Sequence, residues 1–255
     1  MTRSETETVD SPVADDTTRS ETIARPLMRD RYHGQLEALD CSVEELGNLV
    51  IQTIASSIEA LEALDVVRAK TLIEADDHID SKRHEIDEVA FHLLATQQPT
   101  AIDLRLLTAV MTVTSELERI GDYCSGIAKL TLTMAGEPKG EPSQDVASMA
   151  RVTADLLHRA LAAFRDRDVQ TAGIIWTRDD EVDALYQDFF RHQIEEMVNH
   201  RKRVRRGTYM LWVAHNLERM ADRVTNIAEA VAFVVTGDVD GWRHELEAES
   251  VPAGS

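Results

Sequence analysis

The stretch Glu118-Arg-Ile-Gly-Asp122 returns one hundred residues later as Glu218-Arg-Met-Ala-Asp222, and this repeat decides the fold. Two carboxylates four residues apart stand one above the other on the same face of a helix. One such pair indicates little in a chain where 46 of 255 residues are Asp or Glu. The return of the whole segment predicts an internal duplication.

The duplication extends over two blocks of sequence. Around the quoted stretch, nine positions are identical at an offset of 100 residues, from Arg105 and Arg205 to Ala128 and Ala228. A second block repeats at an offset of 103 residues. It carries three aspartates, Asp76, Asp77 and Asp80, which recur as Asp179, Asp180 and Asp183. Self-similarity on this scale marks a repeated structural unit, so each half carries two acidic pairs.

The acidic pairs of each half lie symmetrically about a helix stop. In the first half they share a midpoint at Pro99, and proline ends helices. In the second half the midpoint falls between His200 and Arg201. If two antiparallel helices fold back at these points, the carboxylates arrive at one height, about 28 Å from the turn. We therefore expect a first acidic cluster of Asp76, Asp80, Glu118 and Asp122, and a second acidic cluster of Asp179, Asp183, Glu218 and Asp222.

Composition and hydrophobic spacing favour an all-α fold of two tandem three-helix bundles. Aromatic residues make up only 5%, and apolar residues recur in steps of three and four. In the first half, one helix is predicted over 27–64, a second from Asp65, which caps it, to about 96, and a third after Pro99. The second half predicts helices over about 145–165 and 168–200, and a third beyond. The expected organisation is a disordered acidic tail over 1–26, a bundle over 27–135, a linker over 136–143, a second bundle over 144–236, and a flexible tail over 237–255.

Charge and cysteine content restrict the class of protein. A net charge of −19 argues against nucleic-acid binding through a broad basic surface and favours cations or basic partner surfaces. Two cysteines, Cys41 and Cys124, suit a reducing compartment better than a disulfide framework. The sequence shows neither a secretory signal nor an apolar run of membrane-spanning length. We expect a cytoplasmic protein.

The acidic clusters fall outside the apolar seam of the helices, which predicts surface metal sites. All-oxygen ligands suit Mg²⁺, Mn²⁺, Ca²⁺ and iron. A redox-active carboxylate-bridged iron or manganese centre is the alternative, although a buried centre of that class needs inward carboxylates with Glu-x-x-His motifs. A metal-free helical scaffold is a third possibility, with Arg119 and Arg219 neutralising the carboxylates. No phosphate loop, nucleophile elbow or Cys-x-x-Cys motif is present, so we expect no enzyme.

Two further features are open to more than one interpretation. His215 lies three residues before Glu218 on the same helix face, where it is either a further ligand or an exposed histidine. The basic run Arg201-Lys-Arg-Val-Arg-Arg206 is placed at a helix turn. It is either a solvated turn whose cations face helix C-termini or a docking patch for an acidic protein or anionic lipid.

Two tandem copies of an acidic D-x-x-x-D segment and an L-E-R-hydrophobic-small-D segment resemble the PhoU family of phosphate-uptake regulators. The resemblance covers about residues 27–236. It implies two three-helix bundles, often in a homodimer. It also implies that metal ions bind the acidic motifs, which here are the first and the second acidic cluster. It also implies restraint of phosphate import through the ATPase subunit of a phosphate ABC transporter and a phosphate-sensing histidine kinase. Membrane association is then expected only through those partners. The acidic N-terminal extension and the C-terminal tail depart from the family pattern.

Overall fold

The computed structural model describes residues 16–137 and 143–250, without the side chains of 16–30, 179–180 and 249–250. Over these residues the chain consists of helices joined by short turns, with no strand. The all-α prediction is confirmed. The elements are α1 (Asp16–Ala63), α2 (Val66–Gln97), α3 (Ala101–Met134), α4 (Gln144–Asp166), α5 (Val169–Thr177), α6 (Asp179–Asn199), the 3-10 turn η1 (Arg201–Arg203), α7 (Val204–Thr236) and α8 (Val239–Ser250). Residues up to Ala38 form one compact unit, and Leu39–Ser255 form a second.

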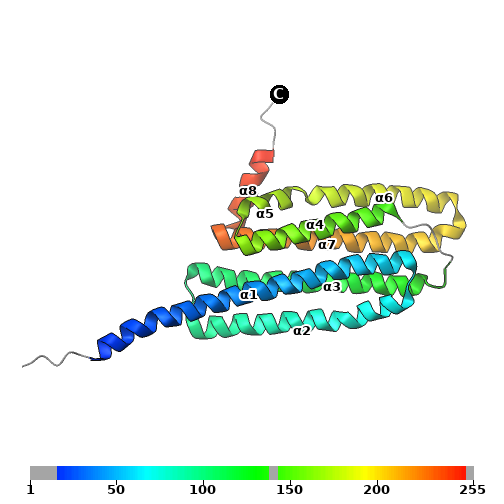
Figure 1. Ribbon diagram of the computed structural model, residues 1–255. Helices are drawn as coiled ribbons and strands as arrows, with labels where there is room; N and C mark the ends of the chain where they lie inside the picture. Colours follow the sequence, from blue (N-terminus) through cyan, green and yellow to red (C-terminus); the bar gives the residue numbers. More distant parts are fainter. Residues whose placement is uncertain (1–15, 138–142, 251–255) are drawn as a thin grey trace, which may run out of the picture. The chain divides into compact units, whose positions relative to one another are not determined.

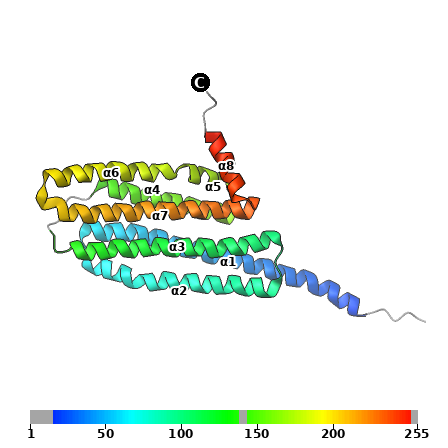
Figure 2. The same cartoon turned by 180° about the vertical axis from the view of Figure 1, so that it is seen from behind.

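The first bundle consists of α1 from Leu39 onward, α2 and α3, which run side by side in Figures 1 and 2. Its core is the predicted apolar seam, with Val50 and Ile54 of α1 buried completely. The Asp65 carboxylate caps α2, since it accepts hydrogen bonds from the backbone N–H groups of Val67 and Arg68 at 3.0 Å each. At the other end, Gln98 takes a left-handed conformation (φ 46°) that ends α2 before Pro99. The chain then reverses into α3.

The second bundle consists of α4, α5 with α6, and α7, and it repeats the capping of the first. Asp168 caps α5 through the backbone N–H groups of Gln170 and Thr171, as Asp65 caps α2. The single helix predicted over 168–200 is interrupted at Arg178, which leaves the helical conformation (φ −99°, ψ 6°). The Arg178 guanidinium pairs with Glu181 in the first turn of α6, where a carboxylate also interacts favourably with the helix dipole. The interruption therefore gives α6 an N-terminus of its own.

An antiparallel pair of helices, α3 and α7, joins the two bundles. The carboxylate of Glu116, buried on α3, accepts hydrogen bonds from Arg223 and Asn226 of α7, at 3.4 and 3.2 Å. Further along, Tyr123 of α3 lies close enough to Arg219 of α7 to raise the pKa of the Arg219 guanidinium. The duplicated helices thus face each other about a pseudo-twofold axis, which the sequence did not reveal because neither chain half contains both partners of a contact.

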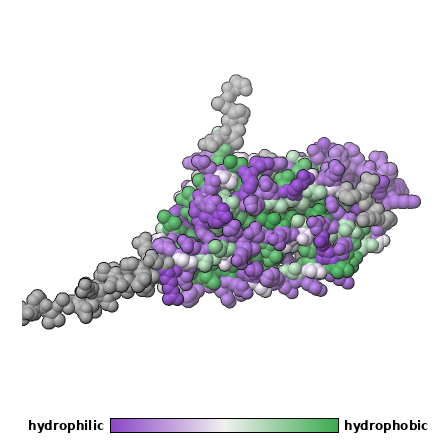
Figure 3. Space-filling view, in the orientation of Figure 1, coloured by the Kyte–Doolittle hydropathy of each residue, from purple (hydrophilic) through white to green (hydrophobic). Residues whose placement is uncertain are grey.

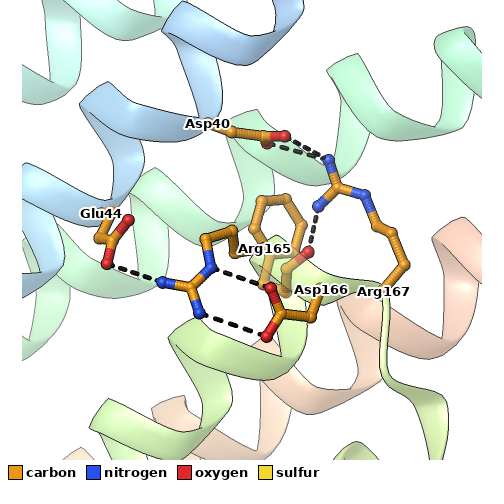
Figure 4. Close-up of polar contacts among 6 residues, drawn as sticks. Asp40, Glu44, Arg165, Asp166 and Arg167 are labelled. Carbon is orange, nitrogen blue, oxygen red and sulfur yellow. Dashed lines mark hydrogen bonds and ion pairs between the residues drawn. The ribbon is translucent and has the colours of Figure 1, made fainter.

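A second polar contact between the bundles links α1 to the end of α4, as Figure 4 shows. Two nitrogens of the Arg165 guanidinium face Asp166, and a third lies 3.0 Å from Glu44 of α1. The Arg167 guanidinium donates to both carboxylate oxygens of Asp40, at 2.9 and 2.7 Å. These pairs are partly exposed, so each stabilises the contact only modestly. They determine which residues of α1 and α4 face each other more than they strengthen the contact.

The chain ends differ from the prediction on both sides. The disordered tail expected over 1–26 is replaced by helix from Asp16 on, and residues 1–15 lie outside the described residues. Extending an existing helix adds one hydrogen bond per residue and needs no buried surface, which the composition argument overlooked. The flexible tail expected over 237–255 contains α8, whose Trp242 is only 6% exposed and packs edge-on against Trp176. The linker expected over 136–143 lies between α3 and α4, and its residues 138–142 are outside the described part.

The register between α2 and α3 is set where Ile79 packs against Gly121. A Cβ atom at Gly121 would lie 2.9 Å from Ile79 Cδ1 and 3.6 Å from Asp76 Oδ1, so only a residue without a side chain fits comfortably. The cross-helix polar pairs follow the same register: Asp76 with Ser125, Arg83 with Glu118, and Asp87 with Thr114. These pairs share a midpoint between Thr100 and Ala101, close to the predicted Pro99. The hairpin therefore brings the acidic pairs of α2 and α3 to one height.

Replacing Gly121 with valine should destabilise the protein, because Ile79 has no free space to receive the added methyl groups. We expect a loss of about 1–3 kcal/mol in the free energy of unfolding, measured by urea denaturation. Gly34→Val is the control, since an added Cβ at Gly34 of α1 meets nothing within 4 Å. Equal stability of the two variants would contradict the close packing at Gly121.

Candidate metal centres

The first acidic cluster lies along the groove between α2 and α3, beside the buried seam. Asp76 and Glu118 are half-buried, whereas Asp80 and Asp122 are exposed to solvent. The neighbouring Ile79 and Ile120 are buried, so the carboxylates flank the core without entering it. This placement agrees with the outward geometry expected from the heptad positions. A buried redox centre with inward carboxylates would need a different arrangement.

Ionisation of the two half-buried carboxyls of the first acidic cluster, Asp76 and Glu118, is opposed by their surroundings. Burial raises the pKa of Asp76, and the charges of Asp122 and Asp80 raise it further, while the nearby Ser125 hydroxyl counteracts them. Burial also raises the pKa of Glu118, which again feels the charges of Asp122 and Asp80. These shared electrostatic effects place all four carboxylates in one another's field. The cluster therefore has an excess of negative charge that a cation would relieve.

One cation of the protein itself already meets this cluster. The Arg83 guanidinium lies 3.6 Å from Glu118 Oε1 and lowers the pKa of Glu118. The predicted neutralising residue Arg119 approaches Glu116, at 3.9 Å, and lowers the pKa of Glu118 less than Arg83 does. Arg83 and Ser125 were not predicted from the sequence, although reflection of the chain about the helix stop would have placed both near the cluster. Side-chain length and rotamer, which the reflection ignores, decide which arginine reaches a carboxylate.

The second acidic cluster repeats the arrangement between α6 and α7. The rings of Tyr186 on α6 and His215 on α7 lie 6.2 Å apart, so these two residues face each other across the hairpin. They are equally far in sequence from the point between His200 and Arg201, which is the predicted register. Burial raises the pKa of Glu218, and the charges of Asp222 and Asp183 raise it further. Asp183, Glu218 and Asp222 are thus brought together. The side chain of Asp179 lies outside the described residues.

Three polar groups of α7 approach the second acidic cluster, the most distant being Arg223, 3.9 Å from Asp222 Oδ2. The Arg219 guanidinium donates to Asp222 Oδ2 at 2.9 Å, as expected for a neutralising arginine. His215 Nδ1 lies 3.3 Å from Glu218 Oε2, but that buried oxygen has no well-aligned hydrogen bond among the described residues. His215 is more than half exposed, with 55% of its side chain accessible. An acceptor oxygen without a donor is the part of this cluster that best fits a metal ligand.

The clusters fit metal ions in ligand type and charge, and only partly in geometry. Carboxylate oxygens are the ligands that Mg²⁺, Mn²⁺ and ferric iron accept. Among the side chains that the structure describes, however, no three carboxylate, imidazole or thiol groups converge closely enough to hold one ion. Rotamer changes at the exposed Asp80 and Asp122 would have to accompany ion binding. The arrangement is therefore an acidic groove that rearranges around a cation.

Two other features of the chain bear on its class. Cys41 is exposed, Cys124 is buried, and both are free thiols. Over residues 16–137 and 143–250, no helix is both long and apolar enough to cross a membrane.

Comparison with protein-family models identifies two copies of the PhoU domain, over residues 43–131 and 146–231. The phosphate-specific transport system accessory protein PhoU homolog of Caulobacter vibrioides is 33% identical over 208 residues, covering 81% of this chain and 90% of that protein. The phosphate-specific transport system accessory protein PhoU of Escherichia coli is 30% identical over 214 residues, covering 84% and 88%. These matches include both halves of the duplication.

Solved structures of PhoU proteins have a similar fold. The crystal structure of the phosphate transport system regulatory protein PhoU from Streptococcus pneumoniae superposes with a TM-score of 0.76 at 29% identity, covering 82% of this chain and 98% of that one. The structure of PhoU from Pseudomonas aeruginosa gives a TM-score of 0.76 at 29% identity, covering 81% and 100%. Both acidic clusters lie within the ranges matched by the family model. The chain belongs to the PhoU family.

Proposed function

We propose that the protein regulates phosphate uptake and phosphate-responsive signalling as a metal-binding adaptor. The observation that carries this proposal is the match of both chain halves to the PhoU domain, with relatives named as accessory proteins of phosphate-specific transport. In this proposal the protein works in the cytoplasm, carries out no catalysis and binds no nucleic acid. A net charge of −19 supports the last point, because it disfavours a phosphate backbone.

The proposed partners are the ATPase subunit of a phosphate ABC transporter and a phosphate-sensing histidine kinase. Long helical faces that carry exposed apolar side chains support protein docking, among them Phe91 of α2 at 60% and Trp212 of α7 at 57% exposure. Exposed aromatic residues are common at protein interfaces. A homodimer is proposed as well, since two copies would double the faces available to each partner.

The acidic clusters are proposed to hold divalent or ferric ions that join the helices of each hairpin. An ion between α2 and α3, or between α6 and α7, would offset the repulsion that raises the pKa values of Asp76, Glu118 and Glu218. A ligand that binds only the folded state stabilises that state. The competing possibility is a metal-free scaffold, which the pairs Arg83 with Glu118 and Arg219 with Asp222 favour. Removal of the carboxylates separates the two possibilities.

Loss of the protein should release phosphate uptake from restraint. Cells without it should import phosphate and express phosphate-starvation genes even when phosphate is abundant, and the intact chain should restore the restraint. Affinity capture of the tagged protein from phosphate-replete cells should recover the transporter ATPase subunit and the kinase. Normal starvation responses in the deletion strain would overturn the regulatory role.

Removing Glu118 and Asp122 together should abolish stabilisation of the first bundle by metal. We expect Mn²⁺ to raise the melting temperature of the chelator-treated wild-type protein, with about 2.7 kcal/mol gained per site at one hundred times Kd. Glu118→Ala/Asp122→Ala should lose the part that comes from this cluster. Glu85→Ala/Glu88→Ala removes the same charge from the exposed face of α2 and should respond as the wild type does. A wild-type protein indifferent to both Mn²⁺ and chelator would support the metal-free scaffold.

The pH dependence of stability should show the strain in the metal-free clusters. A carboxyl whose pKa is raised in the folded state keeps its proton to higher pH there than in the unfolded chain. Its contribution is therefore fully present at low pH and is lost as pH rises from about 4 through the raised pKa. Glu118→Gln removes one such group, so the decline in unfolding free energy as the pH rises above about 4 should become less steep in chelator. In Mn²⁺ the contribution of this carboxyl to the unfolding free energy should instead rise with pH, because protons compete with the ion for the carboxylate. Identical pH profiles of variant and wild type would contradict the raised pKa.

A further inference from the structure

The turn between α6 and α7 gathers positive charge in an otherwise acidic chain. The 3-10 turn η1 consists of Arg201, Lys202 and Arg203, and all three residues are exposed. A 3-10 helix has three residues per turn, so these side chains point in three different directions from the end of the hairpin. Hydrophilic side chains dominate this end of the second bundle in Figure 3. We name Val198–Arg206 the basic turn.

The protein neutralises only part of this charge. Arg203 pairs with Glu196, and Arg205 lies 3.1 Å from Glu137. Arg201 and Lys202 form no ion pair or hydrogen bond with any side chain that the structure describes. Two cations at the tip therefore remain available to an external anion.

Apolar side chains flank these cations. Val198, at the end of α6, is 75% exposed, and Val204, at the start of α7, is 43% exposed. Neither residue contributes to the core of the second bundle. Cations beside exposed apolar residues are the combination that binds the interface of a lipid bilayer, where apolar groups enter the headgroup boundary and cations meet anionic lipids.

We propose that the basic turn binds the surface of an anionic phospholipid membrane directly. The divergence of the three η1 side chains favours a lipid surface over an acidic protein, because a fluid headgroup layer adjusts to a convex tip whereas a protein partner would need a matching hollow. Binding of this kind is peripheral and goes beyond an association that depends on protein partners alone. It also orients the α6–α7 end of the second bundle toward the membrane.

The net charge of −19 does not oppose this contact at physiological salt. Charges more than about 8 Å from the surface are largely screened at 0.15 M ionic strength. The second acidic cluster, near Glu218, lies about four helical turns or about 20 Å of helix from η1, so its repulsion is weak at the tip. Attraction of the basic turn should likewise fade as salt is added.

Vesicle co-sedimentation of the full chain tests the proposal. Wild-type protein should bind vesicles of phosphatidylglycerol mixed with phosphatidylcholine, should not bind pure phosphatidylcholine, and should be released by 1 M salt. Each cation at an anionic surface strengthens binding about fivefold, so Arg201→Ser/Lys202→Ser should weaken it about 30-fold. Circular dichroism melting of the variant should match the wild type, because both side chains are exposed.

The matched control is Lys70→Ser/Arg151→Ser, which removes two exposed cations elsewhere and should bind as the wild type does. Wild-type protein that ignores anionic vesicles, or equal weakening in both double variants, would overturn the proposal. A basic-turn variant that loses binding to a polyglutamate peptide, while vesicle binding is unchanged, would assign the turn to an acidic protein and would also overturn it.

Discussion

The contact of Ile79 with Gly121 fixes how α2 lies against α3, and the rest of the site depends on that register. Because Gly121 has no side chain, the Ile79 side chain and the Asp76 carboxylate both approach the α3 backbone closely. The carboxyl pairs on the two helices then meet at one height. In the second half, the corresponding position holds Ala221, which is also small and buried. A small residue at this point of each hairpin is thus compatible with the same close approach of helices.

Close approach has an electrostatic consequence. Helices that pack tightly bring their acidic pairs out of water and into each other's field, which raises the pKa values of Asp76, Glu118 and Glu218. Among the described side chains, Arg83 lies closest to the first cluster and Arg219 to the second, and Arg119, Lys129 and Arg223 contribute more weakly. The pKa values of Asp76, Glu118 and Glu218 are still raised, so these cations do not fully offset burial and mutual repulsion. An external metal ion would offset the remaining repulsion, and it would do so only while the hairpin holds its register.

Much of this arrangement follows from the sequence because a duplicated chain contains its own symmetry. The midpoint between His200 and Arg201 predicted the register of α6 and α7, and the Asp65 cap was also predicted correctly. The all-α fold follows from apolar spacing, which is a local property. The spacing of the acidic pairs is local as well, and it predicted which carboxylates lie in the two grooves; that they bind metal stays a prediction.

The features that the sequence missed depend on contacts between distant residues. Docking of α8 rests on Trp242 finding Trp176, and a short polar helix gives no local sign of such a partner. The contact of Glu116 with Arg223 depends on how one bundle lies against the other. Both contacts are decided by tertiary packing, which periodicity does not encode. The break at Arg178 is different, because its ion pair with Glu181 spans only three residues and would also fit a continuous helix.

Anomalous diffraction from crystals grown with Mn²⁺ tests the central claim most directly, because it locates ions and ligands together. The account predicts manganese peaks in the groove between α2 and α3 beside Asp76 and Glu118, and between α6 and α7 beside Glu218 and Asp222. The carboxylates of each hairpin should lie at one height around them. Peaks confined to other surfaces, or acidic pairs displaced along the helices by two turns or more, would contradict it.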